Sequence, residues 1–158
     1  MKKKIIEELL LKVRTELSAL ESASKSAKAY VTDGDIKSDG KYDTRGIEAG
    51  YLAGAQEKRV EELKLELQML EEIPIRDFSK GEEVGIGSLV DLTFKGQTRR
   101  YFIAPTAGGT MLNIDGTPIL VISTFSPIGD AVFGTSLGEE FELETPQELR
   151  HYKVEAIS

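Results

Sequence analysis

Two long heptad repeats, separated by a short acidic segment, constrain the fold of this 158-residue chain more than any other feature. Residues 4–30 contain no Gly or Pro, and apolar or small residues recur there at alternating spacings of four and three. A second run with the same spacing begins at Asp43 or Thr44 and ends by Glu72, shortly before Pro74. The spacing predicts two antiparallel helices that form a coiled-coil hairpin. The seam positions are Ile6, Leu10, Val13, Leu17, Leu20, Ser24, Ala27 and Val31, then Gly46, Ala49, Ala53, Gln56, Val60, Leu63, Leu67 and Leu70.

The predicted hairpin is long, because about 27 residues per arm at roughly 1.5 Å of rise span on the order of 40 Å. Its tip, residues 33–43, carries Asp33, Asp35, Asp39 and Asp43. Asp and Gly are common in turns between helices, and Asp39 or Asp43 can cap the second helix. Carboxylates at the end of a long arm also suggest a protein that delivers charge into a partner's site.

A calcium-binding loop is an alternative interpretation of the same tip. Asp35, Asp39, Gly40 and Asp43 fit positions one, five, six and nine of an EF-hand loop. Lys37 occupies the third position, and Gly46 replaces the bidentate Glu at the twelfth. The sequence therefore disfavours a calcium site.

Three glycines at four-residue spacing, Gly46, Gly50 and Gly54, lie on one face of the second predicted helix. Each costs roughly 1 kcal/mol relative to Ala in a helix interior. Either the partner helix approaches closely along this stripe, or the hairpin must be slim or bent near its tip.

After residue 73 the sequence changes to short β-like runs separated by Gly-containing turns. The predicted strands are residues 88–94, 99–104, 119–123, 140–143 and 152–157. Residues 126–134 (SPIGDAVFG) predict a short helix that Ser126 caps and Gly134 ends. We therefore expect an α+β chain, with a helical hairpin over residues 1–75 and a small antiparallel sheet with one helix over residues 76–158.

Composition excludes several classes of protein. The net charge of −7 disfavours a surface that neutralises nucleic-acid phosphates, so we expect no direct, sequence-specific nucleic-acid binding. With no Cys and only His151, neither a disulfide framework nor a His- or Cys-based zinc site is expected. No membrane or signal segment is recognisable, because charges interrupt the apolar stretch after Met1. The expected location is the cytoplasm.

Two regions resemble the bacterial GreA/GreB transcript cleavage factors. In the C-terminal half the similarity lies in residues 126–134, 138–143 (GEEFEL) and 152–157 (YKVEAI). At the tip, Gly34-Asp35-Ile36 followed by Tyr42 is similar to the family's acidic motif. The resemblance implies an FKBP-like C-terminal domain that docks at the rim of the RNA polymerase secondary channel, while the coiled coil enters that channel.

The resemblance also implies a role for the tip carboxylates. They would help the polymerase to hold a second Mg²⁺, so that the polymerase's own active site cuts a backtracked transcript; the factor has no cofactor and no catalytic residue of its own. Asp35 matches the first acidic position, whereas Ser38 stands at the second, and Asp39 is the candidate replacement. Two activities stay open: stimulated cleavage, and polymerase binding that regulates without cleavage. The factor is expected to be a monomer.

The residues that we predict to dock on the polymerase are Phe125, Ile128, Asp130 and Phe133. The apolar ones, together with Val132, are more typical of a core position. Arg99-Arg100 is typical of a solvated strand end, although such a pair also suits an acidic partner surface.

Two other functions were weighed. A peptidyl-prolyl isomerase of FKBP type would need an aromatic-lined pocket, and several of the domain's aromatic residues occupy predicted core positions of strands. A coiled-coil adaptor without a polymerase partner is the third hypothesis.

Overall fold

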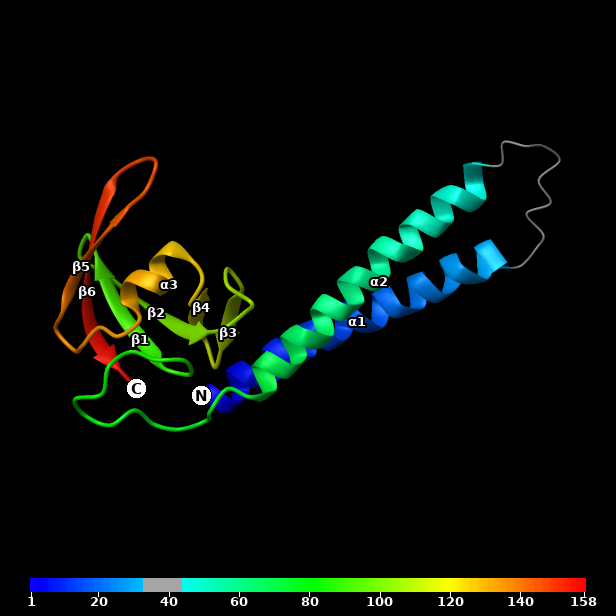
Figure 1. The fold of residues 1–158 in the computed structure, drawn as a ribbon. Coiled ribbons are helices and arrows are strands. Elements are labelled where there is room, and N and C mark those ends of the chain that lie inside the picture. The colour runs from blue at the N-terminus through cyan, green and yellow to red at the C-terminus, as the bar shows by residue number, and fades with distance from the viewer. Residues whose placement is uncertain (33–43) are drawn as a thin grey trace. The chain divides into compact units, whose positions relative to one another are not determined.

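The structure of the protein is a computed structural model. It describes the backbone of residues 1–32 and 44–158, and the side chains of residues 1–23 and 54–158. Helix α1 spans Lys2–Thr32 and helix α2 spans Thr44–Glu71. Figure 1 shows the two helices running in opposite directions. Both predicted helices are confirmed to within a few residues.

The chain divides into two compact units. The hairpin unit comprises residues 10–68, and the sheet unit comprises residues 1–9 together with 69–158. The domain boundary that the sequence suggests near residue 75 stays a prediction.

The heptad seam is buried as its spacing predicts. Val13 of α1 and Val60 and Leu63 of α2 are buried, and Leu17, Leu20 and Leu67 are half-buried. Leu11 and Leu65 of the same helices lie outside the seam and are exposed. Burial of apolar side chains between the two helices is therefore what holds the described part of the hairpin together.

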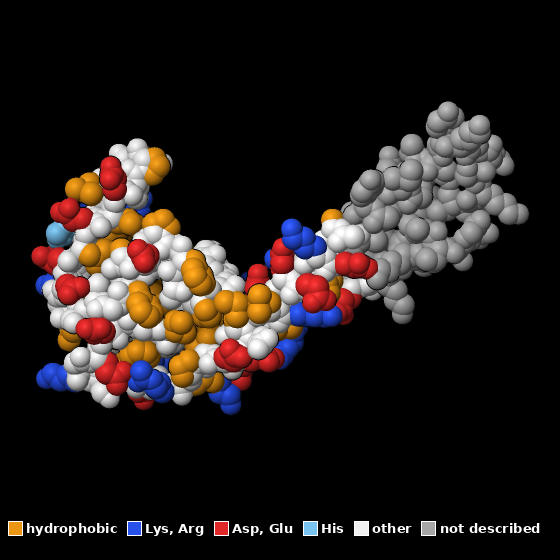
Figure 2. Space-filling view, in the orientation of Figure 1, with side chains coloured by type: hydrophobic (Ala, Val, Ile, Leu, Met, Phe, Trp, Pro, Cys, Tyr) orange, Lys and Arg blue, Asp and Glu red, His pale blue; other side chains and the backbone are white. Residues whose placement is uncertain are grey.

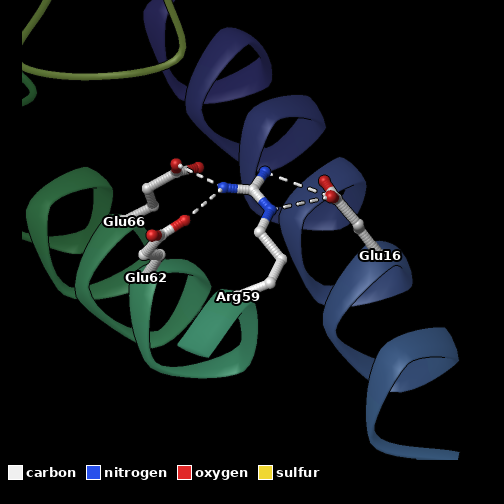
Figure 3. Close-up of polar contacts among 4 residues, drawn as sticks. All are labelled: Glu16, Arg59, Glu62 and Glu66. Carbon is white, nitrogen blue, oxygen red and sulfur yellow. Dashed lines mark hydrogen bonds and ion pairs between the residues drawn. The ribbon is translucent and has the colours of Figure 1, made fainter. Parts of the chain in front are cut away.

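One arginine links the two helices of the hairpin unit through a group of carboxylates (Figure 3). The Nη2 and Nε atoms of Arg59 in α2 donate to one oxygen of Glu16 in α1, at 3.1 and 3.2 Å. Its Nη1 atom faces Glu62 at 3.4 Å and Glu66 at 3.5 Å, both in α2. Since all four side chains remain partly exposed, the contact to Glu16 adds about 0.2–1 kcal/mol and mainly fixes the pairing of the helices.

The sheet unit contains six strands in the order β3-β4-β2-β1-β6-β5. The five predicted strands are present, and β3 is one that the sequence analysis missed. Their bounds are β1 Leu89–Phe94, β2 Gln97–Ala104, β3 Met111–Ile114, β4 Thr117–Ser123, β5 Glu140–Glu144 and β6 Leu149–Ile157. Two tight turns, Lys95-Gly96 and Asp115-Gly116, have positive φ at both residues, as two-residue hairpins require.

The expectation of a purely antiparallel sheet is wrong, because β2 and β4 pair in parallel. The extra strand is the reason. β3 pairs antiparallel with β4, so the chain reverses twice between β2 and β4 instead of once. The FKBP-like character of this domain stays a prediction.

The two faces of the sheet are both buried over its centre. One face packs with Val132 of α3 in a core cluster that includes Val90, Leu92, Tyr101 and Ile103. Because side chains alternate along a strand, the buried neighbours of these residues face the other side. They are Leu89, Phe102, Leu112, Ile114, Ile119 and Val121.

Apolar residues from the ends of the two helices are buried within the sheet unit. Within the sheet unit, the buried apolar side chains outside the strands and α3 include Ile5 and Leu9 of α1, Leu70 of α2 and Ile73. Ile5 and Leu9 lie off the heptad seam, so the partner helix does not account for their burial. The amine of Lys4 also donates to both carboxylate oxygens of Asp115, in the β3–β4 turn, at 2.9 and 2.8 Å.

Helix α3, Pro127–Val132, forms as its sequence predicts. The hydroxyl of Ser126 accepts a hydrogen bond from the Gly129 amide at 3.1 Å, Pro127 takes the first position, and Gly134 follows with φ of 80°. Figure 1 shows α3 lying against the sheet. Over residues 1–32 and 44–158, no helix is both long and apolar enough to cross a membrane.

Removing a seam side chain should destabilise the hairpin. Leu63→Ala deletes a side chain that is 0% exposed and should lower the free energy of unfolding by about 2–5 kcal/mol. Leu65→Ala, two residues away but 58% exposed, is the matched control and should change it by less than about 0.5 kcal/mol. Urea titration followed by far-UV circular dichroism measures both. An equal loss of stability in the two variants would contradict the burial of the seam between the helices.

Two glycine substitutions should have opposite effects on stability. A Cβ on Gly129 would overlap the carbonyl oxygen of Ser123, so Gly129→Ala should destabilise the protein by about 1–3 kcal/mol. No described atom lies within 4 Å of a Cβ built on Gly54, inside α2, so Gly54→Ala should stabilise it by about 0.5–1 kcal/mol. Thermal unfolding compares the two variants. A destabilised Gly54→Ala would instead favour close helix approach along the glycine stripe.

Candidate functional site

The predicted tip residues Asp35 and Asp39, with Ser38 between them, lie outside the described residues. The structure thus describes only the second predicted site, which is the predicted docking surface around α3.

Two aromatic side chains at the ends of α3 are exposed. Phe125, just before the helix cap, is 83% exposed, and Phe133, at the C-terminal cap, is 49% exposed. By contrast, Val132 between them is fully buried. A core role is therefore wrong for both phenylalanines. Figure 2 shows hydrophobic side chains on the displayed face of the sheet unit.

A network of two serines holds the loop that presents Phe125. The Ser126 hydroxyl donates to the Ser123 carbonyl at 2.7 Å, and the Ser126 amide donates to the same oxygen at 3.0 Å. The Phe125 amide donates to the Ser123 hydroxyl at 3.2 Å. Because Gly129 has no side chain, the first turn of α3 can approach this loop closely. Phe125 is thus projected from a fixed backbone, which reduces the entropy lost on binding.

The other two predicted docking residues differ in exposure. Asp130 is exposed in the first turn of α3, where a carboxylate is favoured by the helix dipole whether or not it meets a partner. Ile128 is half-buried and packs against the core cluster, so only part of its side chain is available. The structure brings Phe125, Asp130 and Phe133 to the surface around one short helix.

Sequence reasoning missed Leu137, which is 55% exposed in the loop after α3. The available signal was a single apolar residue next to Gly138, which does not distinguish a core residue from a surface one. Arg99 is exposed, as a solvated strand end predicts. Arg100 is not free, because its Nε and Nη2 atoms bind the two carboxylate oxygens of Asp91 at 2.8 and 3.1 Å.

A groove of about 640 Å³ lies at the start of β2 and β4, but Tyr101 is its only aromatic lining residue. It therefore lacks the aromatic lining that a prolyl isomerase site needs. His151 is exposed on β6, with its two ring nitrogens 3.5 and 3.7 Å from Glu140 and Glu142. Within the described residues, no three His, Asp or Glu side chains converge in an arrangement suited to a metal ion.

Comparison with known proteins places these residues in a family. Residues 79–158 match the family model "Transcription elongation factor, GreA/GreB, C-term". The Gfh1 transcription inhibitor protein of Thermus thermophilus is 29% identical over 154 residues, which cover 96% of this chain and 91% of that protein. Transcription elongation factor GreA of Desulfovibrio desulfuricans is 26% identical over 163 residues, covering 98% and 88%.

A solved structure of Gfh1, the GreA factor homolog 1 of T. thermophilus, matches with 24% identity, coverage of 94% of both chains and a TM-score of 0.39. That score is too low to support a structural conclusion, so the assignment rests on the sequence match. The family model covers half of the chain, including α3, the exposed phenylalanines and the last two strands. The chain belongs to the GreA/GreB family of transcription elongation factors.

Proposed function

We propose that this protein binds RNA polymerase and regulates transcription elongation without being an enzyme itself. The observation that carries the proposal is the pair Phe125 and Phe133, exposed around α3 within the segment that the GreA/GreB model matches. Exposed aromatic side chains on a fixed backbone are typical anchors of protein interfaces. The sheet unit would dock on the polymerase in the cytoplasm, and the hairpin would enter the secondary channel.

The direction of regulation follows from the tip sequence and the relatives. Ser38 replaces an acid of the cleavage-factor motif, and a serine hydroxyl carries no charge to hold a second Mg²⁺. The relatives at 29% and 27% identity are named transcription inhibitor proteins. We therefore infer that the protein slows RNA synthesis by acting at the polymerase Mg²⁺ site through Asp35 and Asp39.

Stimulated transcript cleavage is the second candidate function. It is favoured by Asp39, which lies one residue beyond Ser38 and retains a carboxylate close to the position that the motif requires. A prolyl isomerase is less well supported, because the groove at the start of β2 and β4 has only one aromatic lining residue.

Loss of an aromatic anchor should weaken polymerase binding. Phe125→Ser should reduce the affinity for core RNA polymerase at least about tenfold, as loss of an interface hot spot does. Since Phe125 is 83% exposed, the melting temperature should hardly change. Leu149→Ser, a change at a residue that is 61% exposed on β6, is the matched control and should bind normally. Fluorescence anisotropy measures the affinities. Normal binding by both Phe125→Ser and Phe133→Ser would disprove the docking surface.

Changes at the tip should separate binding from regulation. The Asp35→Ala and Asp39→Ala double variant should bind polymerase with unchanged affinity and lose inhibition of nucleotide addition, since it retains the docking surface and lacks the carboxylates. The assay compares RNA extension and cleavage by a stalled elongation complex over a range of Mg²⁺ concentrations. The Ser38→Asp variant tests whether a carboxylate at the second acidic position makes the protein stimulate transcript cleavage. If the unmodified protein stimulates transcript cleavage, the proposal of inhibition is wrong and the second candidate function is correct.

A further inference from the structure

A cavity of about 530 Å³ in the sheet unit is lined by an unusual number of cations for a chain of net charge −7. Lys2, Lys3, Arg76 and Arg100 contribute positive charges to its lining, and Asp77 contributes a negative one. The other lining residues are Met1, Ile75, Leu89 and Ser158. Arg76 is compensated by Glu82, whose carboxylate lies 2.8 Å from its Nη1 atom.

The ammonium of Lys2 has one hydrogen-bond acceptor among the described protein atoms. The residue is only 8% exposed, and Nζ donates to the carbonyl oxygen of Arg76 at 2.6 Å. Nζ also lies 4.7 Å from the centre of the Phe78 ring. No carboxylate of the described residues comes within 4.0 Å of it. Burial lowers the pKa of Lys2, and the attraction of Asp77 offsets this only in part. An ammonium with three donors is thus buried with one hydrogen-bond acceptor.

Arg100 presents a second under-used donor to the same cavity. Its Nε and Nη2 atoms bind Asp91, which fixes the plane of the guanidinium. Its Nη1 atom has only the thioether sulfur of Met1, at 3.7 Å, and sulfur is a weak acceptor. The bidentate pairing with Asp91 therefore fixes the direction of the Nη1 atom of Arg100. This atom has no oxygen acceptor among the described protein atoms.

The start of α1 adds to the positive potential. The helix begins at Lys2, and its first turn contains no acidic residue to offset the positive end of the helix dipole. Lys3 has only a carboxylate at 4.0 Å, that of Glu7. One buried lysine, the guanidinium edge of Arg100 and the helix end thus contribute charge of the same sign to one cavity.

We propose that this cavity binds a small oxyanion of the phosphate type, free or as the terminal phosphate of a nucleotide. Its oxygens would accept hydrogen bonds from Nζ of Lys2, which has one protein acceptor, and from Nη1 of Arg100, which faces a thioether sulfur. Lys3 would contribute charge from the rim. This binding is separate from the proposed docking surface at Phe125 and Phe133.

The test is a titration of the full chain with inorganic phosphate, pyrophosphate and a nucleoside triphosphate at constant ionic strength. Calorimetry measures affinity, and NMR follows the amides of residues 2–5 and the side-chain Nε–H of Arg100. We expect saturable binding with shifts confined to these groups. Tighter binding of the triphosphate than of pyrophosphate would identify a nucleotide, and equal binding would identify the phosphate group alone. Absence of saturable binding of all three up to about 10 mM would overturn the proposal.

Three variants make the test specific. Lys2→Gln keeps a donor for the Arg76 carbonyl but removes the charge, and should weaken binding about tenfold. Arg100→Lys keeps a cation for Asp91 and removes the Nη1 donor, so it should also weaken anion binding. This variant tests the proposal independently if Lys2→Gln disturbs folding. Lys64→Gln, at an exposed lysine of the hairpin unit, is the control and should bind normally. Unchanged affinity in both cavity variants would also overturn the proposal.

Discussion

The structure depends on the need to cover the second face of the sheet. Phe102 and Ile119 are fully buried on the face opposite α3, and each such side chain contributes about 1.5–3 kcal/mol when it leaves water. Ile5, Leu9 and Leu70, from the first turns of α1 and the last turn of α2, are buried within the same unit. The helix ends therefore belong to the sheet unit.

That packing has a consequence for charge. It places the lysines at the start of α1 next to the segment after α2, so that Lys2 is buried against Arg76 and lines a cavity with Arg100. Burying a cation is unfavourable unless it finds acceptors, and one carbonyl provides only part of what an ammonium requires. This part of the sheet unit thus contains a cavity lined by Lys2, Lys3, Arg76 and Arg100.

Much of the fold was predictable because it depends on local rules. The seam spacing located both helices, the Ser126 cap and Pro127 located α3, and the glycine turns separated the strands. The missed element, β3, has only four residues, with Asn113 among them, and such a short run gives little periodic signal. Because β3 was not predicted, the predicted direction of β4 relative to β2 was wrong. Likewise, the sequence did not distinguish exposed Phe125 from buried Val132, because both are apolar and lie in one short segment.

By itself the sequence determined the two long helices, the capped short helix and the motifs that indicate the family. All of these depend on residues within a few positions of one another, where spacing alone decides which side chains meet. Tertiary structure decided the parallel pairing of β2 with β4, the exposure of Phe125 and the meeting of Lys2 with Arg76. Lys2 and Arg76 are 74 positions apart in sequence, and Arg100 and Met1 are 99 apart. Such contacts depend on which apolar faces of the helices and the sheet pack together. Local sequence patterns do not determine that packing.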